Sequence, residues 1–215
     1  MDEISWSLIV PVKSLTSAKS RLAAAAGEHR EALVLAMACD TVAAALACPL
    51  VAAVLAVTDD PLLAAELTGL GAAVAPDPGT GLNPALRYGS SMLSGAIGAI
   101  NADLPALRSA ELTGVLAGFR AGALAGALET TGGRAFVADA DGTGTTLYLA
   151  GPGTVFAPAF GPDSRARHRA LGLRELPAGP GLRRDVDTLE DLRAALELGL
   201  GPRTEVIADK ILAAQ

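Results

Sequence analysis

Short apolar runs that end at acidic residues alternate along this chain with helix-like segments, and this alternation narrows the fold more than any other feature. The clearest run is VAAVLAVT, residues 51–58, which Asp59, Asp60 and Pro61 follow directly. A continuous apolar strand is typical of a parallel sheet with both faces covered. Asp60 is expected to cap the next helix, with Pro61 at its first position. The pattern therefore predicts a strand–helix unit here.

The same alternation continues over most of the 215 residues. Further strands are expected at 7–12, 72–76, 96–103, 134–140 and 145–150, with a strand end at 181–188. Helices are expected at 29–47, from Pro61 to near Gly69, at 84–93, from Ser109 into 117–128, within 160–172, and finally at 189–198. These elements predict a single α/β domain over residues 1–215, with a mostly parallel sheet and helices on both faces.

Right-handed crossovers would bring the loops after the first, third and fourth strands to one edge, where open α/β sheets bind ligands. The formal net charge of −6 argues against nucleic-acid and anionic-membrane partners, so a bound anion needs a local site. The chain has no P-loop motif, no G-x-G-x-x-G motif and no Cys/His metal cluster. If the chain is an enzyme, its chemistry must come from other residues.

Nothing in the sequence predicts a membrane span or a secretory leader. The apolar stretch 41–57 is rich in alanine and is split by Pro49. Cys39 and Cys48 are nine residues apart, which places them on opposite faces of a helix, so they cannot bridge within it. We therefore expect a reduced, cytoplasmic protein.

The loop after the first strand is unusually basic. Lys13, Lys19 and Arg21 follow the run LIVPV, and the whole chain has only one further lysine. These side chains, with the backbone N–H groups of the 14–17 turn, could hold a triphosphate. The alternative is a solvated basic loop that precedes a helix.

Three aspartates are candidate metal ligands. Asp103 ends the apolar run 96–103, at the edge expected to bind ligands. Asp185 and Asp187 are two residues apart, so on an extended strand both would point to the same face. Together the three could supply two or three carboxylate oxygens to Mg²⁺. The alternative for each is a helix-capping role.

A second anion site is indicated by DGTGTT (141–146) and FGPDSRARHR (160–169). Gly161, Ser164 and Arg165 fall at or near the start of a predicted helix, which favours anions. The segment also carries Arg167, His168 and Arg169, which cannot all face one ligand. Two separate anion sites suggest two anionic substrates. In GLNPAL, Asn83 either contacts a nucleotide base or caps the helix before Pro84.

Taken in order, these stretches resemble the guanylyltransferases of coenzyme F(420) biosynthesis, which act on 2-phospho-L-lactate or phosphoenolpyruvate. The matching pieces are IVPVKSLTSAKSRLA, GLNPAL, DLPAL, FVADADGTGTTL, FGPDSRARHR and GLRRDVDT, which span residues 9–188. Two departures are Ala102, where the family usually has glycine, and one added residue between GTGT and FGPDS. The extra methyl of Ala102 is expected to crowd the nucleotide.

The resemblance implies a Rossmann-like nucleotidyltransferase fold of the GT-A kind, which uses GTP, Mg²⁺ and a small phosphorylated three-carbon acid. Lys13, Lys19 and Arg21 would then be the catalytic and nucleotide-binding cations, with Asn83 also at the nucleotide. The phosphoenolpyruvate-binding residues would be Thr145, Gly161 and Ser164, with Arg165 as a further candidate. The metal ligands would be Asp103 and either Asp185 or Asp187.

The expected reaction is guanylyl transfer from GTP to phosphoenolpyruvate, and the product would pass to a deazaflavin-accepting transferase. The same reaction on 2-phospho-L-lactate or 3-phosphoglycerate is the first alternative. A sugar or cytidylyl nucleotidyltransferase would share the basic loop and the aspartates but would leave FGPDS unexplained. A non-catalytic GTP-binding or scaffold protein is an alternative of another class. A homodimer is one of the oligomeric states that the resemblance leaves open.

Overall fold

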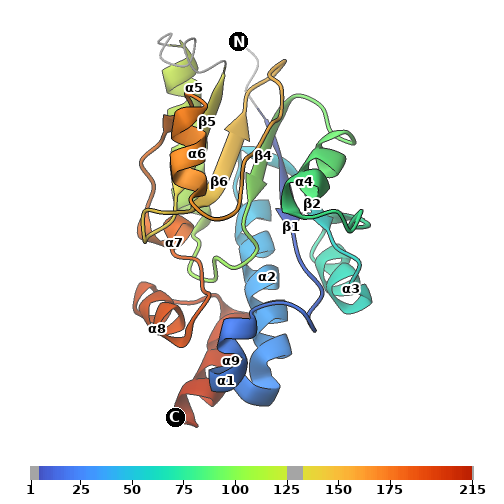
Figure 1. Cartoon of the computed structure of the whole chain (residues 1–215), viewed down its shortest axis with the longest axis vertical. Coiled ribbons are helices and arrows are strands. Elements are labelled where there is room, and N and C mark those ends of the chain that lie inside the picture. The colour runs from blue at the N-terminus through green and yellow to red at the C-terminus, as the bar shows by residue number, and fades with distance from the viewer. Residues whose placement is uncertain (1–4, 125–132, 215) are drawn as a thin grey trace.

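The computed structural model describes residues 5–124 and 133–214 (Figure 1). Its strands are β1 (Trp6–Pro11), β2 (Val51–Val57), β3 (Ala73–Ala75), β4 (Ala96–Ile100), β5 (Arg134–Ala138), β6 (Thr145–Ala150) and β7 (Arg174–Glu175). Its α-helices are α1 (Ala23–Ala26), α2 (Arg30–Leu46), α3 (Pro61–Gly69), α4 (Leu82–Ser90), α5 (Ser109–Leu124), α6 (Ser164–Ala170), α7 (Pro180–Arg183), α8 (Leu189–Leu198) and α9 (Pro202–Ala213). Two 3₁₀ turns, Ser20–Leu22 and Gly27–His29, flank α1.

The strands form one seven-stranded sheet in the order β3-β2-β1-β4-β6-β5-β7. The pairs β2–β3, β1–β2, β1–β4 and β5–β7 are parallel, whereas β6 runs antiparallel to both β4 and β5. Because β6 is reversed, it begins at the edge where β4 and β5 end. This arrangement confirms the mostly parallel sheet predicted from the sequence and gathers several loops at one edge.

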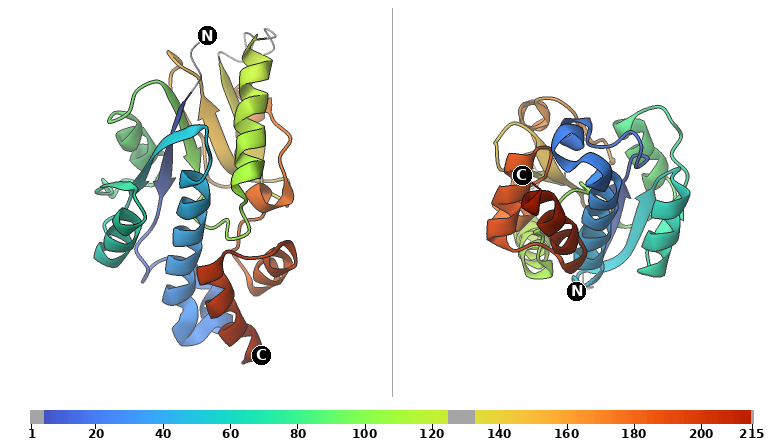
Figure 2. Two further views of the ribbon diagram at one scale, coloured as in Figure 1. Left: turned by 180° about the vertical axis from the view of Figure 1, so that it is seen from behind. Right: turned by 90° about the horizontal axis from the view of Figure 1, so that it is seen from below.

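Side chains of the central strands alternate between two buried layers. In β1, Leu8 and Val10 pack into one apolar cluster and Ile9 into the other. Residues of α2, α3 and α5 contribute to the first cluster, and α4 contributes to the second. Figure 2, seen from behind, shows α2 and α5 together over one face, while Figure 1 shows α4 and α6 over the other. Helices on both faces confirm the predicted layers. Successive side chains of a strand point to opposite faces, and both faces are buried, so the residues of a central strand are mostly apolar on either face.

Local signals define several helix starts as the sequence predicts. The Asp60 carboxylate accepts hydrogen bonds from the N–H groups of Leu62 and Leu63, and Pro61 is the first residue of α3. Thr188 and Asp191 form a reciprocal capping box at the start of α8. These caps depend on neighbouring residues alone.

Two expectations for the C-terminal part were wrong. Residues 181–188 do not end a strand: Pro180 begins the short helix α7, and the segment from Arg184 to Thr188 is irregular. The helix at 189–198 is not the last one, because α9 follows it after the Gly201–Pro202 step. The predicted helix from Ser109 is present to Leu124, but its expected continuation to 128 lies outside the described residues.

Both cysteines, Cys39 and Cys48, are buried and free. Within 5–124 and 133–214, no helix has the length and apolar character needed to cross a membrane. Helix α9 lies with α1 and α8 at one end of the molecule (Figure 1).

Candidate active site

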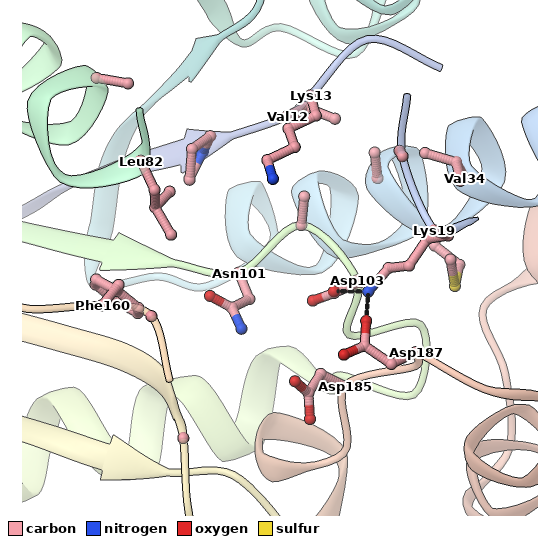
Figure 3. A pocket seen from close by; sticks show the side chains of 18 of the residues that line it. Val12, Lys13, Lys19, Val34, Leu82, Asn101, Asp103, Phe160, Asp185 and Asp187 are labelled. Atoms are coloured by element: carbon pink, nitrogen blue, oxygen red, sulfur yellow. Dashed lines mark hydrogen bonds and ion pairs between the residues drawn. The ribbon is translucent and has the colours of Figure 1, made fainter. Parts of the chain in front are cut away.

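A cavity of about 560 Å³ opens at the edge of the sheet where β1, β4 and β5 end and β6 begins. The loops that follow β1, β3 and β4 all reach it, as the predicted crossovers require. Its polar lining comprises Lys13, Ser17, Lys19, Arg21, Asp77, Asn101, Asp103, Asp139, Thr145, Ser164, Asp185 and Asp187. Figure 3 shows Lys13, Lys19, Asn101 and three of the aspartates around the same open space. A volume of this size is in the range of small-molecule sites.

Two of the predicted cations are free in the cavity wall. Lys13 and Arg21 are exposed, and within the described part of the chain their side chains have neither an ion-pair nor a hydrogen-bond partner. In Figure 3 the Lys13 side chain points into the open space beside Asn101. Unpaired cations in a concave site attract anions, because the low-dielectric walls strengthen their field.

The loop that carries these cations is fixed by two side chains from elsewhere. The Arg30 guanidinium donates to the carbonyls of Leu15 at 2.9 Å and Thr16 at 3.2 Å, and also to that of Ala18. Asp60, which caps α3, accepts from the Leu15 N–H at 3.0 Å. The loop is therefore held in one conformation before any ligand binds.

Lys19 occupies a different environment from Lys13 and Arg21. Its ammonium lies between the carboxylates of Asp103 and Asp187 and forms an ion pair with each (Figure 3). Burial lowers the pKa of Lys19, but the two carboxylates outweigh burial and raise its pKa above the ordinary value. Its backbone is left-handed, with φ 54°, a conformation that is uncommon for residues other than glycine.

Asp185 and Asp187 have different surroundings. They do not lie on a strand, so their side chains do not have to point to the same face. The Val186 N–H donates to the Asp103 carbonyl at 3.1 Å, which ties this irregular segment to the loop after β4. Asp187 contacts Lys19, whereas burial and the neighbouring Asp103 carboxylate raise the pKa of Asp185 well above its usual range. The three carboxylates line one cavity, yet the described residues contain no ready-made group of three or more metal-ligating side chains.

Residues of the GTGT and FGPDS segments meet on the other side of the cavity. Thr145, Gly161 and Ser164 all line it, although they come from β6, a loop and α6. The turn before Thr145 is held by Asp139, whose carboxylate accepts from the N–H groups of Thr143 at 2.9 Å and Gly144 at 2.6 Å. A side chain at position 144 would collide with that carboxylate, which explains the glycine.

The cationic cluster expected in FGPDSRARHR does not face the cavity. Arg165 and Arg169 both pair with Glu175, and Arg165 also donates to the Gly142 carbonyl at 3.0 Å. Arg167 donates to backbone carbonyls of its own loop, and His168 is completely buried. Arg165, the further candidate for binding the acceptor, therefore braces the turn before β6 and does not line the cavity.

Asn83 is neither a helix cap nor part of the cavity lining. Gly81 holds the N-cap position of α4, and the Asn83 amide both donates to the Phe160 carbonyl, at 2.9 Å, and accepts from the Phe160 N–H, at 2.8 Å. It thereby attaches α4 to the loop that precedes Gly161. The Asn83 amide, which was a candidate for contact with a nucleotide base, is therefore occupied by hydrogen bonds to the protein backbone.

Asn101 and Asp139 are among the polar residues that line the cavity and that sequence reasoning missed. Both directly follow a buried strand, β4 and β5 respectively. The rule that selected Asp103, a polar residue at the carboxyl end of a buried strand, could have found them.

The cavity thus offers two kinds of recognition. One side has free cations and carboxylates, which suit a polyphosphate with its counter-ion. The other has a hydroxyl pair and a glycine, Thr145, Ser164 and Gly161, which suit a smaller anion. Within the described residues, the lining of the cavity contains neither histidine nor cysteine.

Comparison with known proteins gives consistent results. The model of the family described as "Guanylyl transferase CofC like" matches residues 6–138. A phosphoenolpyruvate guanylyltransferase of Thermomonospora curvata is 57% identical over 217 residues, which cover 97% of this chain and 91% of that protein. A protein of the same name from Streptomyces scabiei is 53% identical over 222 residues, with 97% and 98% covered.

Among solved structures, a nucleotidyl transferase from Methanothermobacter thermautotroptrophicus superposes with a TM-score of 0.58 at 17% identity. The match covers 90% of this chain and 97% of that one. It concerns the fold alone, and it confirms the nucleotidyltransferase fold expected from the sequence.

Proposed function

The chain belongs to the family of CofC-like guanylyl transferases, and from that premise we propose that it transfers the guanylyl group of GTP to phosphoenolpyruvate and releases pyrophosphate. The observation that carries the proposal is the division of one cavity into a basic, carboxylate-bearing side and a side built from Thr145, Gly161 and Ser164. A triphosphate and a small phosphorylated acid would meet between them.

The basic side would hold GTP. Lys13 and Arg21 are free to bind the triphosphate and to offset the charge that develops as pyrophosphate leaves. Lys19 would contribute the third positive charge, next to Asp103 and Asp187. The braced segment from Leu15 to Ala18 lies between Lys13 and Lys19, so these cations would be held near their binding positions before GTP arrives.

The other side would hold phosphoenolpyruvate through Thr145, Gly161 and Ser164. An oxygen of its phosphate would attack the α-phosphorus of GTP in line, forming a new P–O bond. The bond from the α-phosphorus to the oxygen bridging the β-phosphorus would break, and pyrophosphate would leave with that electron pair. A phosphate monoester has a second pKa near ~6, so at neutral pH the nucleophile is already largely deprotonated and needs no general base.

The carboxylates fit a divalent cation. The Asp103 Oδ1 atom is buried and has no hydrogen-bond partner within the described structure, and the Asp185 carboxyl lies close enough to Asp103 for the two to repel. Asp103 and Asp185, with Asp187 beside them, would hold Mg²⁺ together with water and phosphate oxygens. When bound, the ion would neutralise charge on the phosphates.

An isotope experiment tests this reaction. With phosphoenolpyruvate labelled with ¹⁸O in its phosphate group, the diphosphate product should keep the label in the bridging oxygen, and the released pyrophosphate should carry none. Label in the pyrophosphate, or free GMP from a reaction that contains no deazaflavin-accepting transferase, would contradict the proposal. In a second reaction, that transferase and its acceptor would trap the product and release its guanosine part as GMP, which should then carry the labelled oxygen of the former bridge.

Two other outcomes would identify the alternatives. Transfer to 2-phospho-L-lactate or 3-phosphoglycerate alone would retain the reaction and change the acceptor, since these acids differ from phosphoenolpyruvate by a double bond, a methyl group or a hydroxyl group. Binding of GTP without pyrophosphate release on any acid would favour a non-catalytic GTP-binding protein.

A further inference from the structure

One buried histidine lies directly behind the side of the cavity assigned to the acceptor. His168, on α6, has 0% of its surface exposed. The rings of Phe136, Tyr148 and Phe160 surround it, with ring centroids 5.3, 5.5 and 5.8 Å from that of the imidazole. The imidazole itself does not line the cavity, but both of its nitrogens have partners in the segments that do.

The partner of Nε2 determines where the imidazole proton lies. The Ala159 N–H points at Nε2 from 3.0 Å. A backbone N–H can only donate, so Nε2 must be the acceptor and must carry no proton. A neutral ring then carries its proton on Nδ1. Burial, and secondarily the nearby Arg167 charge, lower the pKa of His168 to about 4, which keeps the ring neutral at pH 7.

The partner of Nδ1 is the hydroxyl of Thr145, 2.9 Å away. Because Nδ1 carries the proton, the Thr145 oxygen accepts this hydrogen bond. A hydroxyl has one hydrogen, and Thr145 cannot direct it back at Nδ1–H. The hydrogen is therefore free to point into the cavity that Thr145 lines. Phosphate and carboxylate oxygens are acceptors, so this hydroxyl presents the polarity that they require.

We propose that His168 is a positioning residue for guanylyl transfer: its Nδ1–H tautomer orients the Thr145 hydroxyl so that it donates a hydrogen bond to the acceptor anion. The identity of that anion as a phosphorylated acid rests on the proposed function. The orientation of the hydroxyl is inferred only from the hydrogen bonds that join Ala159, His168 and Thr145. A histidine that merely filled the aromatic box would need no particular tautomer.

The first test measures the tautomer and needs no substrate. The chain has two histidines, so the ¹⁵N-labelled protein gives two sets of ring signals, and His29→Asn identifies which set belongs to His168. At neutral pH, the His168 Nδ1 should give the signal of a protonated nitrogen and Nε2 that of an unprotonated one. A protonated Nε2, or an imidazolium, would overturn the proposal.

The second test compares two substitutions that divide the functions of the ring. Asparagine at position 168 can offer an N–H close to the place of Nδ1, whereas glutamine reaches closer to Nε2 and leaves Thr145 without its donor. We expect His168→Gln to raise the KM for phosphoenolpyruvate about ten- to a hundredfold, and the KM for GTP less than about threefold. His168→Asn should recover much of this loss, and His29→Asn should behave as the wild type.

A double-variant cycle then asks whether His168 acts through Thr145. Thr145→Val removes the hydroxyl and keeps the shape, and it should produce a loss similar to that of His168→Gln. Combining the two should be no worse than Thr145→Val alone, within about threefold. Losses that multiply, or equal increases in the KM values of both substrates, would show a structural role only.

Failure of the proposed function can be told apart from failure of this inference. If the wild type turned over none of the acids, the proposed function would fail, while the tautomer measurement would still decide the inference. If a variant of His168 did not fold, as shown by its melting curve, the tautomer measurement and the Thr145→Val and Thr145→Ser pair would decide it. In that pair, serine should retain the low KM for phosphoenolpyruvate and valine should lose it.

Discussion

At the scale of single residues, the three cations of the opening loop differ although the sequence treats them alike. Lys19 is held between two carboxylates, whereas Lys13 and Arg21 have no partner within the described residues. The difference arises because the irregular segment with Asp185 and Asp187 folds against the loop after β4, over 160 residues from Lys19 in the chain. Lys13 and Arg21 are therefore the cations available to an incoming triphosphate without the breaking of an internal ion pair.

Lys13→Gln tests this availability. It removes one charged hydrogen-bond donor, so we expect the KM for GTP to rise about tenfold or more, with little change in the melting temperature. Lys210→Gln is the matched control, because Lys210 is an exposed lysine on α9 outside the cavity. Steady-state kinetics with varied GTP would measure both. Equal effects of the two substitutions would show that Lys13 acts only through net charge.

Asp103→Asn tests the carboxylate side. It keeps the shape of the residue but removes the charge that faces Lys19 and the proposed Mg²⁺, so we expect turnover to fall by at least about a hundredfold. The protein should stay folded, as circular dichroism would show. Asp209→Asn, at an exposed position on α9, is the control. Retained activity of Asp103→Asn at ordinary Mg²⁺ concentrations would exclude the assigned role.

At the scale of elements, helix α9 depends on a side chain from a distant part of the chain. The Asp40 carboxylate, buried on α2, accepts from the N–H groups of Arg203 at 3.3 Å and Thr204 at 2.7 Å. It satisfies the free N–H groups that begin α9 and places negative charge at the positive end of the helix dipole. No side chain adjacent in sequence caps this helix.

Asp40→Ala should therefore lower the free energy of unfolding by about 1–3 kcal/mol, because buried N–H groups lose their acceptor. Urea denaturation would measure the loss. We expect hydrogen exchange to accelerate first in α9, and the KM values to stay near those of the wild type. Unchanged stability would mean that water or the backbone replaces the carboxylate.

Elements were predictable from sequence where their determinants are local. The cap of α3 by Asp60 and Pro61 and the apolar strands follow from adjacent residues, and these predictions were confirmed. Helix α9 was missed although Pro202 is its first residue, as Pro61 is that of α3; the acceptor for its first N–H groups, Asp40, lies 164 residues away from Thr204 in the chain. The segment 181–188 was misread because the alternation of Val186 with Asp185 and Asp187 imitates a strand, although Pro180 begins a helical turn there.

The contrast between local and distant determinants also applies to the cavity. The sequence predicted which loops meet, because strand order and crossover handedness limit the choices. It did not predict that Asn83 binds the backbone of Phe160, 77 residues away, or that Glu175 occupies Arg165. Such polar side chains look available in a sequence, and only the packed fold shows which are already paired. The roles of the residues that do line the cavity stay predictions until tested, as does the single domain over residues 1–215.

At the scale of the whole molecule, His168 links stability to pH. Its pKa in the folded protein is about 4, below the ordinary 6.5, so the unfolded chain takes up a proton first as the pH falls. Stability present above about pH 6.5 is therefore lost progressively towards pH 4, by about 3 kcal/mol in total. The pKa of Asp185 is raised in the folded protein, so its protonation as the pH falls increases the stability of the folded state, opposite to the effect of His168.

The comparison of wild type with His168→Phe isolates this effect. Urea denaturation between about pH 7.5 and about pH 4.5 should give a wild type that loses stability relative to the variant as the pH falls. Both proteins carry the Arg167 charge, so its own contribution to stability cancels in the difference between them. A constant difference across this range would show that His168 is protonated in the folded protein as readily as in the unfolded one.

The most direct test of the proposed guanylyl transfer is pyrophosphate release from the purified protein with GTP and Mg²⁺, measured separately with phosphoenolpyruvate, 2-phospho-L-lactate and 3-phosphoglycerate. The deazaflavin-accepting transferase and its acceptor should be present in each reaction. We expect much more release with phosphoenolpyruvate than with the other two acids. Release of none, from a protein that binds GTP, would contradict the proposed transfer.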